Sequence, residues 1–442
     1  MKRPSWCLLA VLSSCIDFDA LQLQQVARLD AGSQTDGGSA TGGGGGATGG
    51  GSVIGGGSAI GGGSATGGGS ATGGGASAGG GVATGGGSAG GGGTATGGGG
   101  FTGFVFTADL PRPRAGATAV LLNTGKVLIV GDRDYCSSIE VFQYDPAGAG
   151  SMSTIGALDA GEYAGTVTLL ASGKVLVTVG VCAAGLAELV DPASTPAVAP
   201  AQALRMPRMN AAASLLADGR VLLVGGDQGA SATAEVFDPA AGGGSGAFSL
   251  IAGPGVRRFF ASTVRLLDDR VLLVGGIDGA GSVIPAVQLF DPRAMGFVGT
   301  GGLNQGRIQH VATLLQDGRV LVAGGRTIAP LTLLKSAELY DPDGGVFTAT
   351  GSLTVARVNA FAVQLADGRV LVGGGFGEDG GVLASAEIFD PSANSGAGAF
   401  VNAPSMNVAR RSAAAVRLLS GTVLVCGGYD NFTQLASCEL LR

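Results

Sequence analysis

Residues 317–325 read DGRVLVAGG, and this stretch decides the fold because copies of it return along the chain. Four copies end in the same pair of glycines, and two worn copies begin the series: residues 218–226, 268–276, 367–375 and 420–428, then 124–132 and 172–180. The valine at the fourth position marks the register: Val127, Val175, Val221, Val271, Val320, Val370 and Val423. A period of about 50 residues indicates seven structural repeats.

Each repeat is predicted to form four short strands. Asp-Gly favours a two-residue hairpin turn in which both central residues have a positive φ. An apolar run such as residues 211–216 precedes the turn and a β-branched run follows it, so the two runs are expected to pair. A third strand, such as residues 234–239, ends at Asp-Pro because proline has no N–H for the ladder. The fourth strand carries an aromatic residue: Phe248, Phe297, Phe347 and Phe400.

These features predict an all-β fold, a seven-bladed β-propeller over residues 101–442. Residues 437–442 provide a third strand for the last blade, and no fourth strand follows them. Residues 103–107 look like a fourth strand with no first three before it. We therefore expect this N-terminal strand to close the ring, which removes unpaired sheet edges. Six blades remain the alternative if blade one or two is degenerate.

The repeated phrases resemble the kelch repeat, including the propeller of the galactose-oxidase type. The resemblance is carried by the glycine pairs, by the Ala-Glu-x-apolar-Asp-Pro strand and by an Arg that opens each first strand, and it is strongest from Arg208 onward. The usual Trp is Phe here, and the second glycine is replaced by Asp132 and Val181 in the first two blades. The resemblance implies a kelch-like propeller.

The first hundred residues are predicted to export and tether the propeller. Residues 1–15 combine a basic start with an apolar centre, and Cys15 ends a lipoprotein-type cleavage box, so it is the predicted lipidation site. An ordinary secretory signal is the alternative. Residues 16–100 are predicted to be a disordered linker, because most are Gly, Ser, Ala and Thr. This places the protein in a bacterial cell envelope, lipid-anchored at the outer membrane or cell surface.

The charge balance limits the partners. The chain has 26 Lys and Arg against 32 Asp and Glu, a net charge of −6. A mildly acidic chain without a basic run argues against nucleic acid as a partner. We expect a monomer that is held at the membrane by its lipid and binds an envelope protein or a glycan, with no cofactor.

Four cysteines follow Cys15, an even number that permits two disulfides in an exported chain. Cys426 and Cys438 belong to neighbouring strands of the last blade, and Cys136 and Cys182 to the same end of adjacent blades. We favour the pairs 426–438 and 136–182. A metal site is the weaker interpretation, because there is no CxxC spacing and only one histidine.

One position ten residues before each turn recurs in every repeat: Arg114, Glu162, Arg208, Arg258, Arg307, Arg357 and Arg410. These residues are ligand-binding candidates, since a ring of guanidinium groups at the channel mouth suits a carboxylate or acidic sugar. The favoured alternative is structural: each Arg pairs with a glutamate of the third strand. Gln288 breaks the glutamate series and Glu162 breaks the arginine series, so these two positions are of special interest.

His310, the single histidine, is a further ligand-binding candidate. It stands where kelch units often carry histidine, so a structural residue is the favoured interpretation over a catalytic base. A copper oxidase of the galactose-oxidase type needs two histidines and a Tyr–Cys cross-link, which the sequence does not assemble. No serine-nucleophile motif is present either.

Three functions are compatible with this sequence. The first, and the one expected, is a non-enzymatic interaction module that binds protein or glycan through its loop face. The second is a sugar-modifying enzyme of the epimerase or lyase type that uses Arg and Glu at the channel mouth. The third is a structural surface protein. The first is favoured because few titratable residues beyond the repeated ones are expected at the mouth.

Overall fold

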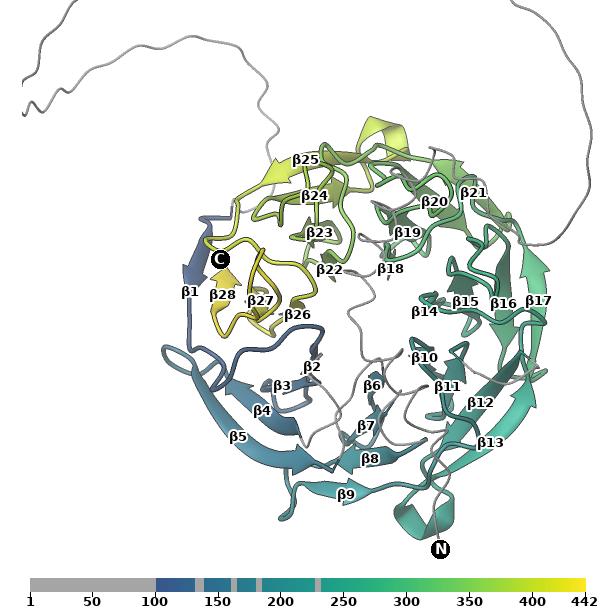
Figure 1. The fold of residues 1–442 in the computed structure, drawn as a ribbon, viewed down its shortest axis with the longest axis vertical. Coiled ribbons are helices and arrows are strands. Elements are labelled where there is room, and N and C mark those ends of the chain that lie inside the picture. The colour runs from purple at the N-terminus through teal and green to yellow at the C-terminus, as the bar shows by residue number, and fades with distance from the viewer. Residues whose placement is uncertain (1–100, 132–138, 160–164, 180–184, 227–231) are drawn as a thin grey trace, which may run out of the picture. The chain divides into compact units, whose positions relative to one another are not determined.

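A computed structural model describes residues 101–131, 139–159, 165–179, 185–226 and 232–442. They form seven four-stranded antiparallel sheets arranged as blades around an axis (Figure 1). The predicted all-β, seven-bladed propeller is confirmed, and six blades are excluded. Cys15 and the predicted signal and linker segments lie outside the described residues, so the lipid anchor stays a prediction.

The blades follow one another in chain order, and each is given from its innermost to its outermost strand. Blade 1 is β2 (Thr118–Leu121), β3 (Val127–Val130), β4 (Ile139–Asp145) and β5 (Ser151–Leu158); blade 2 is β6 (Thr166–Leu169), β7 (Val175–Thr178), β8 (Ala187–Val190) and β9 (Val198–Pro200). Blade 3 is β10 (Ala212–Leu215), β11 (Val221–Val224), β12 (Thr233–Asp238) and β13 (Ala247–Ala252); blade 4 is β14 (Ser262–Arg265), β15 (Val271–Val274), β16 (Val287–Asp291) and β17 (Gly296–Thr300).

The remaining three blades repeat this order. Blade 5 is β18 (Val311–Leu314), β19 (Val320–Ala323), β20 (Ala337–Asp341) and β21 (Val346–Ala349); blade 6 is β22 (Phe361–Gln364), β23 (Val370–Gly373), β24 (Ala386–Asp390) and β25 (Ala399–Ala403). Blade 7 is β26 (Ala414–Arg417), β27 (Val423–Cys426), β28 (Cys438–Leu441) and β1 (Phe104–Phe106). Two short 3₁₀ turns are η1 (Gly242–Gly244) and η2 (Asn394–Gly396). None of the helices in the described part of the chain is long and apolar enough to cross a membrane.

The antiparallel order gives the ring two faces. We call the face that carries the first-to-second and third-to-fourth strand connections the turn face. The opposite face carries the second-to-third strand loops and the segments that lead into each first strand, and we call it the loop face. Each recurrent Arg therefore lies at the loop face, just before the innermost strand of its blade.

The Asp-Gly turns differ from the predicted type. In blade 3 the Gly219 N–H donates to the Leu216 carbonyl and the Leu216 N–H to the Arg220 carbonyl, so the loop is longer than two residues. Gly219 has φ +86°, whereas Asp218 is not among the described residues with positive φ. This is a four-residue turn followed by a glycine bulge. The Asp218 carboxylate accepts the Arg220 N–H at 3.1 Å, which favours the observed turn.

The core lies between neighbouring blades. All four residues of each second strand are buried, and their side chains alternate between the two adjacent blades. Between blades 4 and 5, for example, Leu272 and Val274 pack in one cluster with Val320 and Val322. Aromatic pairs join the third and fourth strands, as predicted from the fourth-strand Phe residues: the ring centroids of Phe389 and Phe400 are 4.9 Å apart. Such pairs add about 0.5–1.5 kcal/mol beyond burial.

In blades 3 to 7 the glycine pair fastens the blade to the next one. The second glycine donates its N–H to the carbonyl of the following blade's recurrent Arg, as Gly325 does to Arg357 at 2.9 Å. The first glycine leaves no room for a side chain, because a Cβ at Gly324 would lie 2.8 Å from the Arg357 carbonyl oxygen. The same bond joins the last blade to the first, from Gly428 to Arg114 at 2.7 Å.

The last blade closes the ring with a strand from the other end of the chain. β1 pairs antiparallel with β28, with Phe104 opposite Leu441 and Phe106 opposite Glu439. Cys426 and Cys438 lie opposite each other on β27 and β28 and form a disulfide. Cys136 and Cys182 lie outside the described residues, so the pair 136–182 stays a prediction.

Candidate functional site

The recurrent arginines are buried links within their blades. Their exposed fractions are 0–2%: Arg114, Arg208, Arg258, Arg307, Arg357 and Arg410. Each donates from Nη1 to the carbonyl of the first glycine position of its own blade, at 2.9 Å from Arg307 to Gly324. This geometry fits the structural interpretation, and the contact of these groups with a ligand stays a prediction. Glu162, the seventh member, lies outside the described residues.

A third-strand glutamate has two tasks in most blades. In blade 5 the Glu338 carboxylate accepts from Arg307 Nη2 at 2.8 Å and from the N–H groups of Asn304 and Gln305 at 2.7 and 3.2 Å. The residues at the same positions repeat this arrangement in three other blades: Glu235 with Arg208, Glu387 with Arg357, and Glu439 with Arg410. The carboxylate thus neutralises a buried cation and also caps the segment before it.

Blade 2 keeps its glutamate in a different setting. Both carboxylate oxygens of Glu188 accept the Asp159 N–H, at 3.1 and 3.3 Å. Burial raises the pKa of Glu188, the Asp159 N–H opposes this effect, and the Asp159 charge adds to it. In blade 2 the recurrent position is occupied by Glu162, which lies outside the described residues.

Blade 4 has no glutamate. Gln288 accepts from Arg258 Nη2 at 3.2 Å and donates to the Pro254 carbonyl at 2.9 Å. Arg258 makes no ion pair with any residue that the structure describes, although only 2% of it is exposed. Burial lowers the pKa of Arg258 to about 10. In Arg307 and Arg410 burial also lowers the pKa, but their glutamates oppose the shift.

His310 is a packed, neutral imidazole. A Cβ at Gly275 of blade 4 would collide with its Cε1, and one at Gly325 would lie 2.9 Å from its Cβ, so the ring fills the gap between two glycines. Neither ring nitrogen has a hydrogen-bond partner among the described residues. Burial lowers the pKa of His310 to about 3, and the positive charge of Arg307 lowers this pKa further. The backbone of Arg307 partly opposes the shift. This packing fits the structural interpretation of His310, and its contact with a ligand stays a prediction.

The channel mouth is rimmed by residues that lie two positions after the recurrent Arg. They share a positive φ of 52–59°: Asn210, Phe260, Gln309, Asn359 and Ser412. Backbone hydrogen bonds connect them from blade to blade, from Asn359 to Gln309 at 3.2 Å and from Ser412 to Asn359 at 2.9 Å. Because the innermost strands of neighbouring blades pack around the axis, this chain of bonds rims the loop-face end of the channel.

Among the described blades 4 to 7 the rim residues differ from blade to blade, and a polar group of them lies on blades 5 to 7. The residue after the glycine pair is Ile277 in blade 4 and Phe376 in blade 6, but Arg326 in blade 5 and Tyr429 in blade 7. Arg326 Nε donates to the Gln309 side chain at 2.6 Å, and this Arg is only 8% exposed. We name Gln309, Arg326, Asn359, Arg411 and Tyr429 the mouth arc.

Blade 7 contributes a stacked pair to the mouth arc. The Arg411 guanidinium lies 5.3 Å from the centre of the Tyr429 ring, and the two residues form an antiparallel bridge. Both side chains are half-buried, and Gln434 Nε2 donates to the Tyr429 hydroxyl at 3.3 Å. A guanidinium over an aromatic ring is favourable by about 0.5–2 kcal/mol and holds both groups in place.

The sequence predicted binding through the loop face, where Tyr429 and Arg326 begin the loops that follow two of the glycine pairs. Gln309, Asn359 and Arg411 were missed, because the rim positions share a backbone conformation and not a residue type. The available signal was their fixed place, one or two residues after the recurrent Arg.

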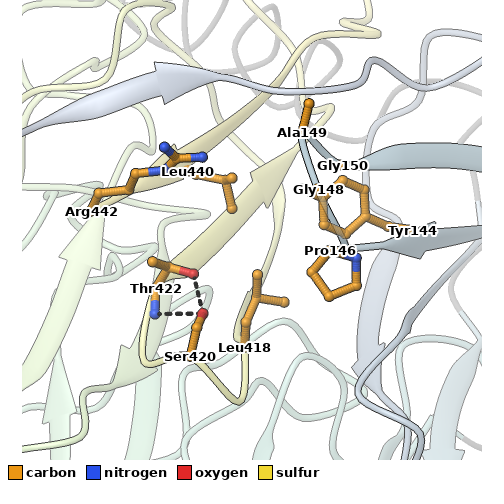
Figure 2. Close-up of a pocket in the computed structure, with 10 residues that line it drawn as sticks. All are labelled: Tyr144, Pro146, Gly148, Ala149, Gly150, Leu418, Ser420, Thr422, Leu440 and Arg442. Carbon is orange, nitrogen blue, oxygen red and sulfur yellow. Dashed lines mark hydrogen bonds between the residues drawn. The ribbon is translucent and has the colours of Figure 1, made fainter.

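Figure 2 shows a pocket on the turn face between blades 7 and 1. It encloses about 200 Å³, and Leu418, Leu440 and Pro146 supply apolar surface. Ser420 Oγ and Thr422 Oγ1 lie 2.7 Å apart within the β26–β27 turn. Arg442 is the single charged side chain among the described residues of its lining, so the pocket lacks a pair of groups for acid–base chemistry.

A metal site requires several donor side chains close together. No group of three or more His, Cys, Asp or Glu side chains in the described ranges is arranged to hold a metal ion. The single histidine is buried between glycines. The donors present do not fit a copper centre, and we derive no metal-dependent step.

Comparison with known proteins identifies the fold and not the family. No protein-family model matches the chain, and no curated protein sequence matches it. A novel fungal alcohol oxidase of the AA5 family, in complex with copper, is similar with a TM-score of 0.61 and 17% identity, over 77% of this chain and 76% of that one. The structure of YjhT is similar with a TM-score of 0.51 and 14% identity, over 66% of this chain and 98% of that one.

These neighbours contradict the expected non-enzymatic function. The alcohol oxidase carries an enzymatic activity on this fold, so the prediction of an interaction module without catalysis is wrong by this comparison. The expectation rested on the scarcity of titratable residues beyond the repeated ones. That argument failed because repeated residues hold the blades together and say nothing about what the rim and loops can do.

Proposed function

We propose that the propeller is an enzyme that acts on a carboxylate-bearing sugar at the mouth of its loop face. The observation that carries the proposal is the asymmetry of the rim, where the mouth arc gathers two guanidinium groups, a phenol and two amides on blades 5 to 7. A ligand site needs such asymmetry, whereas the buried Arg–Glu links repeat from blade to blade. The enzymatic fold neighbours make catalysis the better-supported class.

The order of the mouth arc suits a sugar acid. Asn359 bonds through its backbone to Gln309 on one side and to Ser412, the neighbour of Arg411, on the other. Arg326 and Arg411 therefore flank Asn359 along the rim. Guanidinium groups bind carboxylates by paired hydrogen bonds, and amides and a tyrosine face bind sugar hydroxyls and rings.

The chemistry that fits these groups is proton transfer next to a carboxylate. A guanidinium bound to the substrate carboxylate stabilises the negative charge that develops when the adjacent carbon loses its proton. The Tyr429 hydroxyl is the proton-transferring group of the arc, since tyrosine is one of the side chains that serve as general acids and bases. Delivery of a proton from water to the other face of this carbon gives an epimerase. Transfer of the abstracted proton from Tyr429 to the departing glycosidic oxygen, with formation of a carbon–carbon double bond, gives a lyase.

The test is a turnover screen with the full-length chain. Uronate oligosaccharides are incubated in deuterated water, and NMR follows deuterium exchange next to the carboxylate and formation of a double bond. We expect Tyr429→Phe to abolish turnover and Arg411→Gln to raise KM at least about tenfold, since a charged hydrogen bond contributes about 1.5–3 kcal/mol. Tyr340→Phe is the matched control, because its hydroxyl contacts Thr300 between outer strands.

Two results would overturn the proposal. One is full activity of Tyr429→Phe, and the other is a wild-type protein that neither binds nor converts uronates. Uncharged sugars provide the comparison, since they lack the carboxylate that the arginines are proposed to bind.

The envelope location belongs to the proposal as a separate part. A lipid on Cys15 would hold the enzyme at a membrane by the Gly-rich linker, near envelope glycans. Cys15→Ala is expected to move the protein from the membrane fraction to the soluble exported fraction. Unchanged membrane retention would refute the anchor.

A further inference from the structure

Blade 4 has Gln288 where the third strands of the other blades have a glutamate, and this difference is separate from the mouth arc. In four blades the glutamate accepts the N–H groups of residues three and two positions before the recurrent Arg. The corresponding donors of blade 4 are Gly255 and Val256. Neither N–H has an acceptor among the described residues, because Gln288 directs its amide to Pro254 and Arg258 instead.

The same blade carries an uncompensated positive charge. The Arg258 guanidinium is buried and forms no ion pair with the described part of the chain, so the charge that Glu338 offsets next to Arg307 is not offset here. Burying a cation without a counter-charge costs several kcal/mol. An anion beside this segment would therefore be stabilised by the charge and by two N–H donors that have no acceptor among the described residues.

A pocket lies at this segment. It encloses about 430 Å³ at the loop face, and Gly255, Val256, Arg257, Asp278 and Gly279 line it. The Arg257 head group lies against Gly279, where a Cβ would meet its Nη2, so the guanidinium forms part of the wall. Asp278 forms the other polar wall and accepts the Ala280 and Ser282 N–H groups at 2.8 and 2.9 Å.

We propose that this pocket binds a small hydroxylated monocarboxylate. The ligand carboxylate accepts the Gly255 and Val256 N–H groups and supplies the charge that glutamate supplies in the other blades. Arg257 strengthens this attraction. Asp278 repels a second negative charge and accepts a ligand hydroxyl, which selects a sugar acid or similar hydroxy acid over sulfate or phosphate.

The test uses sodium D-glucuronate as the probe and the full-length chain with Arg411→Gln, so that binding at the mouth arc does not interfere. NMR amide shifts of Gly255 and Val256 report occupancy directly, and calorimetry gives the affinity. Glucose, acetate and sulfate are titrated in parallel. We expect glucuronate to move both amide signals, with acetate binding more weakly and glucose and sulfate leaving them unchanged.

Gln288→Glu is the decisive variant, because it installs the carboxylate that the third strands of the six other blades have. We expect it to weaken glucuronate binding at least about tenfold, the effect of roughly 1.4 kcal/mol. Asp278→Asn is expected to admit sulfate. Glu338→Gln creates a similar charge defect in blade 5, whose Asn304 and Gln305 do not line the blade 4 pocket, and it should leave glucuronate affinity unchanged.

Three outcomes would overturn the site: no amide shift with glucuronate, equal affinity of Gln288→Glu and its parent, or equal binding of sulfate, which would mean an adventitious ion only. Failure of the mouth-arc enzyme leaves these measurements untouched, since none of them depends on turnover. If Gln288→Glu does not fold, the Gly255 and Val256 shifts of the parent decide alone.

Discussion

Blades 4 and 5 are neighbouring copies of the same repeat, and they differ at the partner of the recurrent Arg and at the histidine position. Blade 5 has the full link, with Arg307 and Glu338 paired at 2.8 Å, and it also carries His310 against the glycines. Blade 4 has Arg258 with Gln288, and Ala261 in place of the histidine. The β-strands of the two blades still pair in the same way.

Because blade 4 keeps the strand pairing of blade 5 without an Arg–Glu ion pair, the fold of a blade depends more on its backbone pattern than on its buried charge pair. Arg258 keeps the bond to the Gly275 carbonyl, which corresponds to the bond that the other five recurrent arginines make within their own blades. A blade can therefore lose its carboxylate and keep its shape. The loss leaves a charge and two N–H donors that a ligand can use.

The largest expected effect comes from breaking the complete pair. Glu338→Ala leaves Arg307 buried without its counter-charge and strips acceptors from two N–H groups, so we expect a loss of about 3–5 kcal/mol in the free energy of unfolding. Gln288→Ala in blade 4 removes neutral hydrogen bonds only, and about 1–2 kcal/mol is expected. Urea denaturation of both variants measures the contrast. Equal losses would show that the ion pair adds nothing to blade 5.

The second effect is the acid sensitivity of blade 5. The pKa of His310 is about 3 in the folded protein and about 6.5 when unfolded, so between these values the unfolded chain binds the extra proton. Folding stability is therefore lost as pH falls below about 6.5. Replacing His310 by Ala, the blade 4 residue, should remove roughly 2–3 kcal/mol of the loss between pH 7 and pH 4.

The check on this effect is the slope of stability against pH. Any cavity left by His310→Ala lowers stability equally at all pH values, so it does not change the slope. A variant with the same slope as the wild type would show that His310 is accessible to protons in the folded ring.

The third effect restores the template in blade 4. Gln288→Glu gives Arg258 a partner and gives Gly255 and Val256 an acceptor, and we expect a gain of about 1–2 kcal/mol in the absence of ligand. Thermal unfolding measures it, and the inverse variant Glu338→Gln in blade 5 is the comparison. A loss of stability in Gln288→Glu would mean that the blade 4 backbone cannot seat a carboxylate.

The smallest effect is expected on the turn face, where the two blades agree. The exposed pairs Asp268–Arg270 and Asp317–Arg319 both have contacts of 2.6 Å within one turn. Asp268→Asn and Asp317→Asn should each cost less than about 1 kcal/mol, because exposed pairs are weak and asparagine still suits the turn. A large difference between the two would show that the Arg319 contacts to Gly396 and Pro391 depend on Asp317.

Much of the ring could be predicted because its repeats are short-range patterns. The glycine pairs, the fourth-strand Phe residues and the Arg and Glu series each recur at one position per blade, and each fills the same structural place. The turn type was mispredicted, since the Asp218 carboxylate accepts the N–H of Arg220, two residues further on, and the positive φ falls on Gly219. Periodicity does not reveal which of two compatible turns a side chain favours.

The candidate sites were less predictable for the opposite reason. The mouth arc includes Gln309, Asn359 and Arg411, which differ in residue type, and blade-to-blade backbone bonds of Gln309, Asn359 and Ser412 bring their segments together. Gln288 was noticed as an exception in the sequence, but the free N–H groups of Gly255 and Val256 and the pocket beside them follow from three-dimensional packing. Activity was mispredicted because structural residues dominate the repeat.

The pairing of β1 with β28 determines when the ring can close during synthesis and folding of the chain. The Thr102 hydroxyl bonds to the carbonyl of Arg442, across a separation of 340 residues. On the ribosome and during any passage through a translocation channel, β1 is made before every other strand of the ring, and its partner emerges only after the six preceding blades. β1 therefore has an unpaired edge until β28 has been synthesised, and the ring can close only when the last blade forms.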